Sequence, residues 1–232
     1  MSPLDLPGGS RRYLQIARQL AGEIDTGRYA SGERLPPERE LAQTLDVSRT
    51  TVREALLALE IMRYIEIKVG AGVYVLDAAV RARGVPSEPD SAAPSEVLAA
   101  RRLVEAETAA LAATHATPAQ LQGMREANDQ MAASIDDIAR FDAADALFHQ
   151  RVAEAAGNDV LSGFVAQLWR MRESEMWAFW YDQTRHPDNR RQSVEDHRAI
   201  LRAFERRSAD AARTAMQSHL DVLADRFYEL KL

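Results

Sequence analysis

Apolar and polar positions recur at helical spacing between residues 41 and 59, which predicts two short amphipathic helices that meet at a tight turn. The apolar positions that we expect to be buried are Leu41, Ala42, Leu45, Val47, Val52, Ala55 and Leu56. The polar positions that we expect to be exposed at the start of the second helix are Ser48, Arg49, Thr50, Thr51 and Arg53. Hydroxyl and guanidinium groups in such a place suit phosphates and guanine edges in a DNA major groove. The alternative is an ordinary surface helix with a polar N-terminus.

The flanking segments extend this helix pair to a winged helix-turn-helix. Residues 13–24 repeat apolar side chains at helical spacing and are followed by Gly27, a common helix terminator. Two prolines within residues 31–42 set an extended entry into the next helix, and the acidic residues after them suit the positive end of its dipole. Residues 65–68 and 73–76 flank a glycine-rich segment and predict a β-hairpin.

The segment GERLPPERELAQTLDVSRTTVREALLALE, with the glycine-rich hairpin after it, resembles the N-terminal domain of the GntR family of bacterial transcription regulators over roughly residues 10–76. The resemblance implies double-stranded operator DNA as a partner. The residues that it assigns to DNA binding are Arg39, Ser48, Arg49, Thr50, Thr51, Arg53 and Gly70. Asp46 stands at the turn where the family usually has glycine. Because aspartate tolerates left-handed backbone geometry, we expect the turn to persist.

The chain is expected to be mainly α and to hold two domains. Residues 81–96 are rich in proline, serine, alanine and acidic residues, which predicts a flexible linker. We therefore place the winged helix-turn-helix at residues 10–78, the linker at 79–94 and an all-α helical bundle at 95–228. A chain of 232 residues is long enough for two hydrophobic cores.

The expected bundle contains six helices or more, with breaks allowed inside the longer ones. Their ranges are 95–115, 118–134, 137–156, 158–182, 190–206 and 208–230. Thr117-Pro118 is a typical helix start, Gly157-Asn158 a typical helix end, and Ser208 can cap the last helix.

Composition constrains the partners only in part. The chain has no cysteine, which excludes disulfides and thiolate metal sites and suits the cytoplasm. No apolar run approaches the roughly 20 residues that span a bilayer, so we expect no membrane partner. The net charge of −6 is divided unequally, near +1 for residues 10–76 and near −6 for residues 77–232. DNA affinity must therefore come from locally placed arginines, and from two copies in a homodimer, rather than from bulk charge.

Three of the five histidines form a pattern with an aspartate. Asp145 and His149 are four residues apart and would share one helix face. His197 and His219 fall on the last two expected helices, and both rings can reach one point if these helices are antiparallel neighbours. One carboxylate and three imidazoles suit a divalent cation such as Zn²⁺, Ni²⁺ or Mn²⁺. The alternative is ordinary hydrogen-bonding histidines on helix surfaces or in the core.

Residues 95–225 resemble the all-helical C-terminal effector domain, of FCD type, in the FadR branch of the same family. The matching segments are EVLAARRLVEAETAALAA, DALFHQRVAEAAGN and EDHRAIL with a later HL. The metal ligands implied by this resemblance are Asp145, His149, His197 and His219, with a small carboxylate effector completing the coordination. Arg101 would bind the carboxylate of the effector. The alternative for Arg101 is a surface ion pair with Glu105, and Arg102 would face outward.

The effector is expected to be a sugar acid, with a smaller hydroxy or keto acid as the second choice. Residues 170–180 resemble the corresponding helix of regulators that respond to hexuronates and related sugar acids. Trp169, Trp177 and Trp180 could provide a ring that stacks on a sugar face, or they could form ordinary aromatic core packing.

The sequence thus predicts a DNA-binding transcription regulator, expected to be a repressor, whose operator affinity responds to the carboxylate at the metal site. A homodimer would place two winged helices on the half-sites of a pseudo-palindromic operator. One alternative is a metal-dependent hydrolase or lyase fused to a DNA-binding module, since the ligand set could activate water. No HExxH-type motif supports the enzyme, but Glu195 and Glu105 are candidate bases. A third hypothesis is an architectural DNA-binding protein with an inert metal-stapled bundle.

Overall fold

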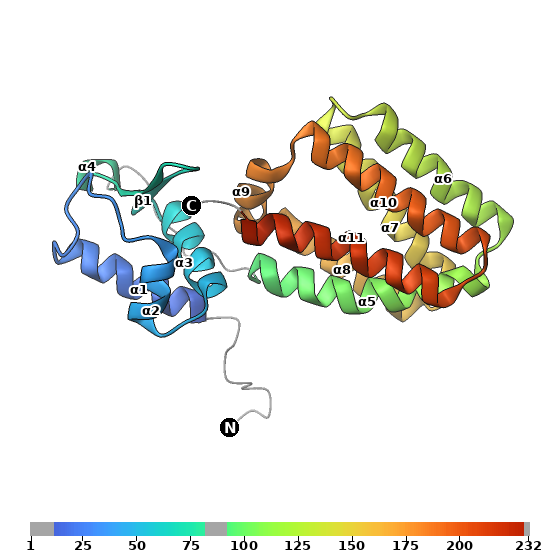
Figure 1. Ribbon diagram of the computed structural model, residues 1–232, viewed down its shortest axis with the longest axis horizontal. Helices are drawn as coiled ribbons and strands as arrows, with labels where there is room; N and C mark the ends of the chain where they lie inside the picture. Colours follow the sequence, from blue (N-terminus) through green and yellow to red (C-terminus); the bar gives the residue numbers. More distant parts are fainter. Residues whose placement is uncertain (1–11, 82–91, 230–232) are drawn as a thin grey trace, which may run out of the picture. The chain divides into compact units, whose positions relative to one another are not determined.

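The computed structural model describes residues 12–81 and 92–229 of the chain (Figure 1). These residues divide into two compact units, each of which is described by itself below. The described parts of the first unit are residues 12–81, 92–96, 174–180 and 228–229. The parts of the second unit are residues 97–173 and 181–227. Most of the predicted linker, residues 82–91, lies outside the described residues.

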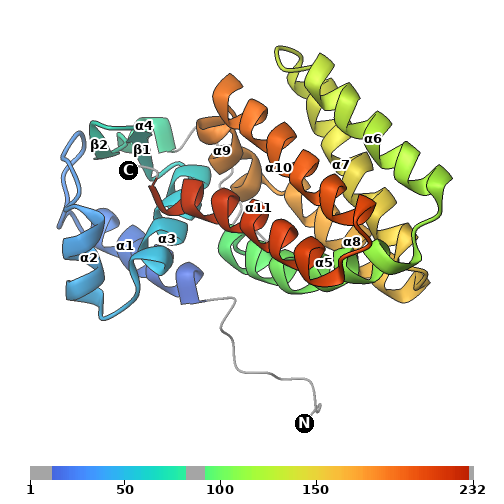
Figure 2. The same ribbon diagram turned by 45° about the vertical axis from the view of Figure 1, so that its right-hand side comes forward.

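The first unit is a winged helix-turn-helix, as the spacing of its apolar residues predicts (Figures 1 and 2). Its elements are α1 (Arg12–Asp25), α2 (Glu38–Leu45), α3 (Arg49–Ile61), β1 (Ile65–Lys68), β2 (Gly72–Val75) and the short α4 (Ala78–Arg81). The two strands pair antiparallel, with Ile65 opposite Val75. A single bridge between Arg34 and Tyr74 joins the segment before α2 to the hairpin.

The turn between α2 and α3 keeps its geometry without a glycine. Asp46 has φ 51° and ψ 51°, in the left-handed region, and its backbone N–H donates to the carbonyl of Ala42. Ser48 then caps α3, because its Oγ accepts a hydrogen bond from the Thr51 N–H at 3.0 Å. The expectation that aspartate would preserve this turn is confirmed.

The apolar faces of α1 and α3 form the core of this unit. Leu20 on α1, Ile65 on β1, and Leu56, Leu57 and Leu59 on α3 are at most 1% exposed. Full burial of such a side chain stabilises a fold by about 1.5–3 kcal/mol. The core therefore fixes the orientation in which α3 presents its outer face.

The second unit is an all-α bundle, also as predicted. Its helices are α5 (Pro94–His115), α6 (Pro118–Ala133), α7 (Ile138–Ala155), α8 (Asp159–Arg170), α9 (Glu175–Thr184), α10 (Pro187–Glu205) and α11 (Ala209–Glu229). Of these, α5, α9 and α11 belong to this unit only in part. The helix expected over residues 158–182 is broken by a 3₁₀ turn, η1 (Met171–Glu173). Ser174 then starts α9 by accepting a hydrogen bond from the Trp177 N–H. Within residues 12–81 and 92–229, no helix combines the length and the apolarity that a membrane span needs.

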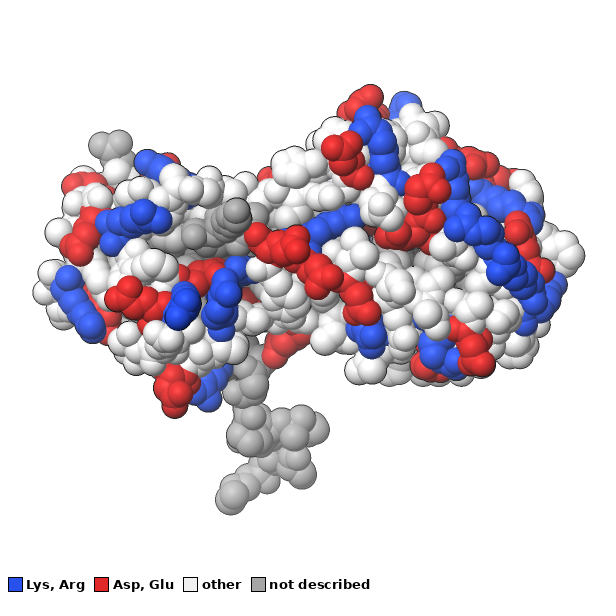
Figure 3. Space-filling model, in the orientation of Figure 1, with Lys and Arg blue, Asp and Glu red and all other residues white. Residues whose placement is uncertain are grey.

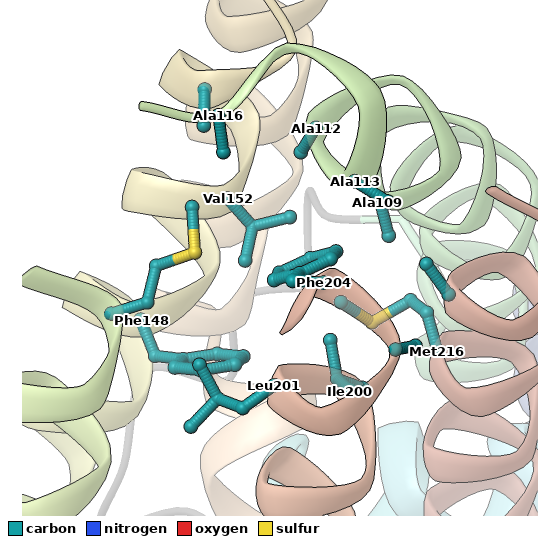
Figure 4. Packing of buried hydrophobic residues seen from close by; sticks show 14 of the residues in the cluster. Ala109, Ala112, Ala113, Ala116, Phe148, Val152, Ile200, Leu201, Phe204 and Met216 are labelled. Carbon is teal, nitrogen blue, oxygen red and sulfur yellow. The ribbon is translucent and has the colours of Figure 1, made fainter. Parts of the chain in front are cut away.

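Small and large side chains face each other in the core of the bundle (Figure 4). Ala109, Ala112 and Ala113 line the inner face of α5, and Phe204 of α10 and Met216 of α11 belong to the same cluster. Alanines let helix backbones approach closely, since the distance between helix axes depends on the side chains at the contact. The cluster holds α5, α7, α10 and α11 around one interior, where several polar side chains also gather.

Candidate metal centre and nucleic-acid interface

The four side chains that the sequence marks as metal ligands meet inside the bundle. Asp145 and His149 lie one turn apart on α7, His197 lies on α10 and His219 on α11. One ligand atom from each lies within 4.8 Å of the others, and all four residues are buried. Their burial excludes the alternative in which these histidines lie on exposed helix surfaces.

The spacing of these atoms fits a small cation. Oδ1 of Asp145 lies 3.7 Å from Nε2 of His149 and 3.5 Å from Nε2 of His197. A tetrahedral cation with ligand bonds of about 2.1 Å separates neighbouring ligands by about 3.4 Å. The ring of His197 is stacked on Phe148 with a centroid distance of 4.0 Å, which fixes its plane. The donor set is therefore consistent with a metal site.

The same atoms lack other partners. Among the described residues, Oδ1 of Asp145, Nε2 of His149 and both ring nitrogens of His197 are buried without a hydrogen bond. Most buried polar atoms in proteins are paired, and leaving one unpaired costs about 1–3 kcal/mol. Several unpaired atoms that converge on one point indicate a binding site rather than a structural network.

Two carboxylates orient two of the imidazoles through hydrogen bonds to Nδ1, on the side of each ring away from the cluster. Glu105 of α5 accepts a hydrogen bond from Nδ1–H of His149, and Asp196 of α10 accepts one from Nδ1–H of His219 at 3.2 Å. These bonds leave Nε2 of each ring for a cation, as is common for metal-binding histidines. The sequence carries no local signal for either contact, because the partners are 44 and 23 residues apart.

Burial keeps two of the imidazoles neutral. It lowers the pKa of His149 against the opposing effect of Glu105, and it lowers the pKa of His197 well below the ordinary value, with a further contribution from His219. Burial alone would raise the pKa of Glu105, but Arg101 and His149 outweigh it and hold that pKa below its ordinary range. Neutral imidazoles bind metals and protonated ones do not, so these ligands are available at neutral pH.

Arg101 lies beside this centre and forms the ion pair with Glu105, but not at the surface. Its side chain is 1% exposed, and Nε donates to Oε1 of Glu105 at 2.6 Å. Nη1 finds no hydrogen-bond partner in the described part of the chain. The guanidinium lies 4.4 Å from the centre of the Trp169 ring. The surface alternative for Arg101 is wrong, and the buried NH₂ group at Nη1 remains available to an anion. Arg102 is partly exposed and paired with Asp221, as its predicted outward position requires.

Arg172 is a residue of the site that the sequence pattern does not indicate. It lies in η1, where Nη1 is 3.4 Å from Oδ2 of Asp145 and the guanidinium is 4.0 Å from the Trp169 ring centre. The break after α8 determines its position, and helical periodicity alone gives no sign of it. Trp169 thus adjoins the site. Trp177 and Trp180 are instead buried and meet edge to face at 4.7 Å, which favours core packing for them.

Six of the seven residues assigned to DNA binding reach the surface of the winged unit. Arg39, Ser48, Arg49 and Gly70 are exposed, while Thr50 and Thr51 are half-buried. Gly70 has φ 77° at the tip of the hairpin, a conformation that side chains disfavour. On the face shown in Figure 3, basic and acidic side chains of this unit are interleaved, in keeping with its near-neutral charge.

Arg53 differs from the other six, and the expectation that it is exposed is wrong. Its side chain is 4% exposed, and Nε and Nη2 donate to the two oxygens of Glu38 at 2.7 and 2.8 Å. Glu38 begins α2, so this buried ion pair joins the two helices of the helix-turn-helix. The exposed Arg49 lies one turn earlier on α3, 3.4 Å from the same carboxylate. Arg53 therefore positions α3, and direct DNA contact by Arg53 stays a prediction.

Comparison with known protein families agrees with both halves of this structure. The family model for bacterial regulatory proteins of the gntR family matches residues 12–75, and the model for the FCD domain matches residues 96–222. The chain belongs to the GntR family of transcription regulators and carries an FCD domain.

Individual relatives extend this assignment over nearly the whole chain. The chain is 37% identical over 231 residues to the Uxu operon transcriptional regulator of Escherichia coli strain K12, covering 94% of this chain and 88% of that protein. It is 34% identical over 216 residues to the Exu regulon transcriptional regulator of the same strain, covering 91% and 82%. The solved structure of E. coli McbR/YncC shares the fold, with a TM-score of 0.52, 21% identity and coverage of 94% and 97%. The Uxu and Exu proteins are transcriptional regulators.

Proposed function

We propose that this regulator changes its affinity for operator DNA when a small carboxylate binds at the metal centre of its FCD domain. The observation that carries the proposal is a set of buried atoms, on Asp145, His149 and His197, that converge without partners among the described residues. Arg101, whose Nη1 is also unpaired, lies beside the same cluster. A cation that takes five or six ligands would have a coordination position left for an oxygen of the effector, and Arg101 would bind the same carboxylate.

The cation would be held by Asp145, His149, His197 and His219. Mixed nitrogen and oxygen ligands suit Zn²⁺, Ni²⁺ or Mn²⁺. As a Lewis acid, the cation would bind a carboxylate oxygen of the effector. A sugar acid is the effector that we favour, because the sequence resembles regulators that respond to hexuronates and the chain is similar to Uxu and Exu regulators.

The DNA contacts would come from the exposed residues of the winged unit. Arg49 would read a base edge from the start of α3, with Arg39, Ser48, Thr50 and Thr51 near the phosphates and the backbone of Gly70 reaching in from the wing. Such contacts in a weakly charged unit give limited affinity, so the proposal includes a homodimer on a pseudo-palindromic operator, acting as a repressor.

Exposed apolar side chains on the bundle support the dimer. Leu103 and Leu111 of α5 are 68% and 38% exposed, and Val160 and Phe164 of α8 are 67% and 57% exposed. The members of each pair are eight or four residues apart, so each pair lies on one helix face. We propose that a second copy of this chain covers these faces, since exposed apolar patches commonly mark protein interfaces.

The test measures binding to DNA sequences selected from a random library with the metal-loaded protein. Galacturonate or a related acid is expected to change the dissociation constant by about tenfold, within the usual range of allosteric coupling. Removing the metal with a chelator, or the substitution Arg101→Ala, should abolish this response and leave DNA binding itself in place. The control is Arg102→Ala, which alters a solvent-facing ion pair on the same helix. A response that survives in Arg101→Ala or in the metal-free protein contradicts the proposal.

A further inference from the structure

A narrow cavity adjoins the metal centre within the second unit. Asp145 and His219 of the centre line it, and its other charged lining residues are Arg101, Arg172, Arg185, Arg190 and Arg226. Its volume is about 20 Å³, enough for a water molecule. Because Asp145 is the one carboxylate among these lining residues, the cavity wall is strongly positive.

Helix geometry places two of the arginines away from the metal ligands. Arg190 precedes His197 by seven residues on α10, and Arg226 follows His219 by seven residues on α11. Seven residues are about two helical turns, so each arginine lies on the face of its histidine and about 10 Å further along the axis. Both lie at the same end of the bundle, since Nη2 of Arg226 donates to the carbonyl of Asn189 at 3.3 Å.

These two arginines also differ from the others in their partners. Three of the lining arginines are paired with carboxylates: Arg101 with Glu105, Arg172 with Asp145 and Arg185 with Asp182. Arg190 is 6% exposed and donates to the carbonyls of Ile135 and Arg185. Neither Arg190 nor Arg226 forms an ion pair with any described residue. A buried cation without a counter-charge is costly, so this end of the cavity favours an anion.

The state of Arg226 supports this conclusion. Burial lowers the pKa of its guanidinium, and the more distant carboxylate of Asp196 offsets that effect only in part. The group remains charged at neutral pH, because arginine titrates far above that range. An anionic ligand would supply the counter-charge that the protein provides to the other lining arginines.

Neutral oxygen atoms lie between the two charged ends. Ser193 is three residues after Arg190 and four before His197, which places it midway on the same face of α10. Its Oγ donates to the carbonyl of Asn189 at 3.1 Å, and Nδ2 of Asn189 donates to the carbonyl of Thr184 at 2.6 Å. With these donors used, the side-chain oxygens of Ser193 and Asn189 can accept hydrogen bonds from hydroxyl groups of a ligand.

We propose that the effector is a hydroxylated acid with a second anionic group at its far end. Its first anionic group binds at the metal centre and Arg101, and its second binds Arg226 and Arg190. The inference rests on the proposed function of the metal centre and adds the class of ligand, a sugar diacid or a phosphorylated sugar acid. Since the cavity holds little more than a water molecule, the half-buried side chain of Arg226 moves aside to admit the acid and then closes on its second anion.

The experiment compares matched acids by calorimetric titration of the metal-loaded full chain. Galactarate is compared with galacturonate, and 6-phosphogluconate with gluconate, so that each pair differs in the second anionic group. We expect at least one dianion to bind about tenfold or more tightly than its partner, in line with charge-assisted hydrogen bonds to arginine. The pair with the larger difference distinguishes a carboxylate from a phosphate at the second position.

Variants of Arg226 assign the difference to this residue. Arg226→Gln should remove the advantage of the dianion and leave the monoanion within about twofold, whereas Arg226→Lys should keep part of the advantage. Arg213→Gln, a partly exposed control on the same helix that is paired with Glu107, should change neither affinity. Equal affinities within both pairs, or an equal loss for both members in Arg226→Gln, would overturn the inference while leaving the proposed function intact. Binding of no acid in the presence of metal would overturn both.

Discussion

The winged unit and the bundle both bury ionisable side chains, and they pair the polar atoms of these side chains to different extents. In the winged unit, Arg53 and Glu38 are joined by two hydrogen bonds from the guanidinium to the carboxylate. In the bundle, Asp145 and His197 keep buried atoms that find no partner among the described residues. A buried pair of the first kind holds two helices in place. A cluster of the second kind costs stability unless something binds there.

This contrast separates two sets of residues that look alike in the sequence. Arg53 and His149 both sit in helices that resemble functional segments of the family. The structure shows that Nε and Nη2 of Arg53 donate to Glu38, whereas Nε2 of His149 is left over after Nδ1 has bound Glu105. What remains unpaired, rather than what is charged, therefore marks the binding site.

The largest effect is expected from breaking the Arg53–Glu38 pair. Glu38→Ala leaves the buried guanidinium without its carboxylate, which should reduce the free energy of unfolding of the winged unit by about 3–5 kcal/mol. Urea unfolding, monitored by the exchange of amide hydrogens in α2 and α3, measures this loss of stability. The control Glu40→Ala removes an exposed carboxylate from the same helix and should cost at most about 1 kcal/mol. Equal losses in the two variants would show that the pair does not stabilise the unit.

The next effect comes from filling the unpaired cluster in the bundle. A cation present at a hundred times its dissociation constant should stabilise the folded chain by about 2.7 kcal/mol. Thermal unfolding with added Zn²⁺, Ni²⁺ or Mn²⁺, and again with a chelator, measures this change. His197→Ala should lose the response, and His115→Ala should keep it, because the His115 ring is exposed and bonds the carbonyl of Ala156. Retention of the full response in His197→Ala would exclude the cluster as the metal site.

Two arginines of α3 then test the division between structure and DNA binding. Arg49→Ala should weaken binding to a selected operator by about 1–3 kcal/mol if Arg49 reads a base. Its free energy of unfolding should fall by at most about 1 kcal/mol, because the contact of Arg49 with Glu38 is long and mostly exposed. Arg53→Ala should instead lower the stability of the winged unit, since it leaves the buried Glu38 with only its long contact to Arg49. Titration of labelled DNA and urea unfolding of both variants provide the two measurements. Loss of DNA affinity at full stability in Arg53→Ala would assign a direct contact to that residue.

The smallest effect concerns Glu54, a buried carboxyl with no counter-charge among its described contacts. It accepts hydrogen bonds from the N–H and Oγ of Ser95, and burial raises its pKa to about 7. The folded chain therefore holds this proton at pH values where the unfolded chain has lost it. Its contribution to stability is full below about pH 4.5 and is lost as the pH rises to about 7.

We expect the loss over this range to be about 1–2 kcal/mol after allowance for solvent screening. Urea unfolding at a series of pH values measures it. Glu54→Gln should remove this part of the pH dependence and leave the part that comes from Glu60, because burial also raises the pKa of Glu60 to about 7. Glu40→Gln, at an exposed position of α2, should leave the profile unchanged. A wild-type stability that rises between pH 4.5 and 7 in this unit would contradict the assignment to Glu54.

The sequence was sufficient for features that depend on local pattern. Asp46 and Ser48 mark the turn and the cap of α3 because backbone conformation and capping are decided within a few residues. Asp145 and His149 share a face because they are four residues apart, and His197 and His219 follow from the resemblance to the family. The burial of all four agrees with that expectation.

Features that depend on contacts between distant elements could not be predicted. Arg53 looks like its exposed neighbours until α2 is placed against it. Glu105 reaches His149 across the bundle, and Arg172 faces Asp145 because the chain leaves the α-helix in η1. In each case the sequence determines which residue is present, and the tertiary arrangement determines what it touches.

The metal ligands also tie together parts of the chain that no covalent bond joins. The sequence has no cysteine, so no disulfide restricts its unfolded state. A cation held from α7, α10 and α11 closes long loops, and closing a long loop removes conformational entropy from the unfolded chain much as a disulfide does. The loaded centre would therefore act as a reversible cross-link, so that the last two helices melt together with α7 in one transition and separate from it once the cation is withdrawn.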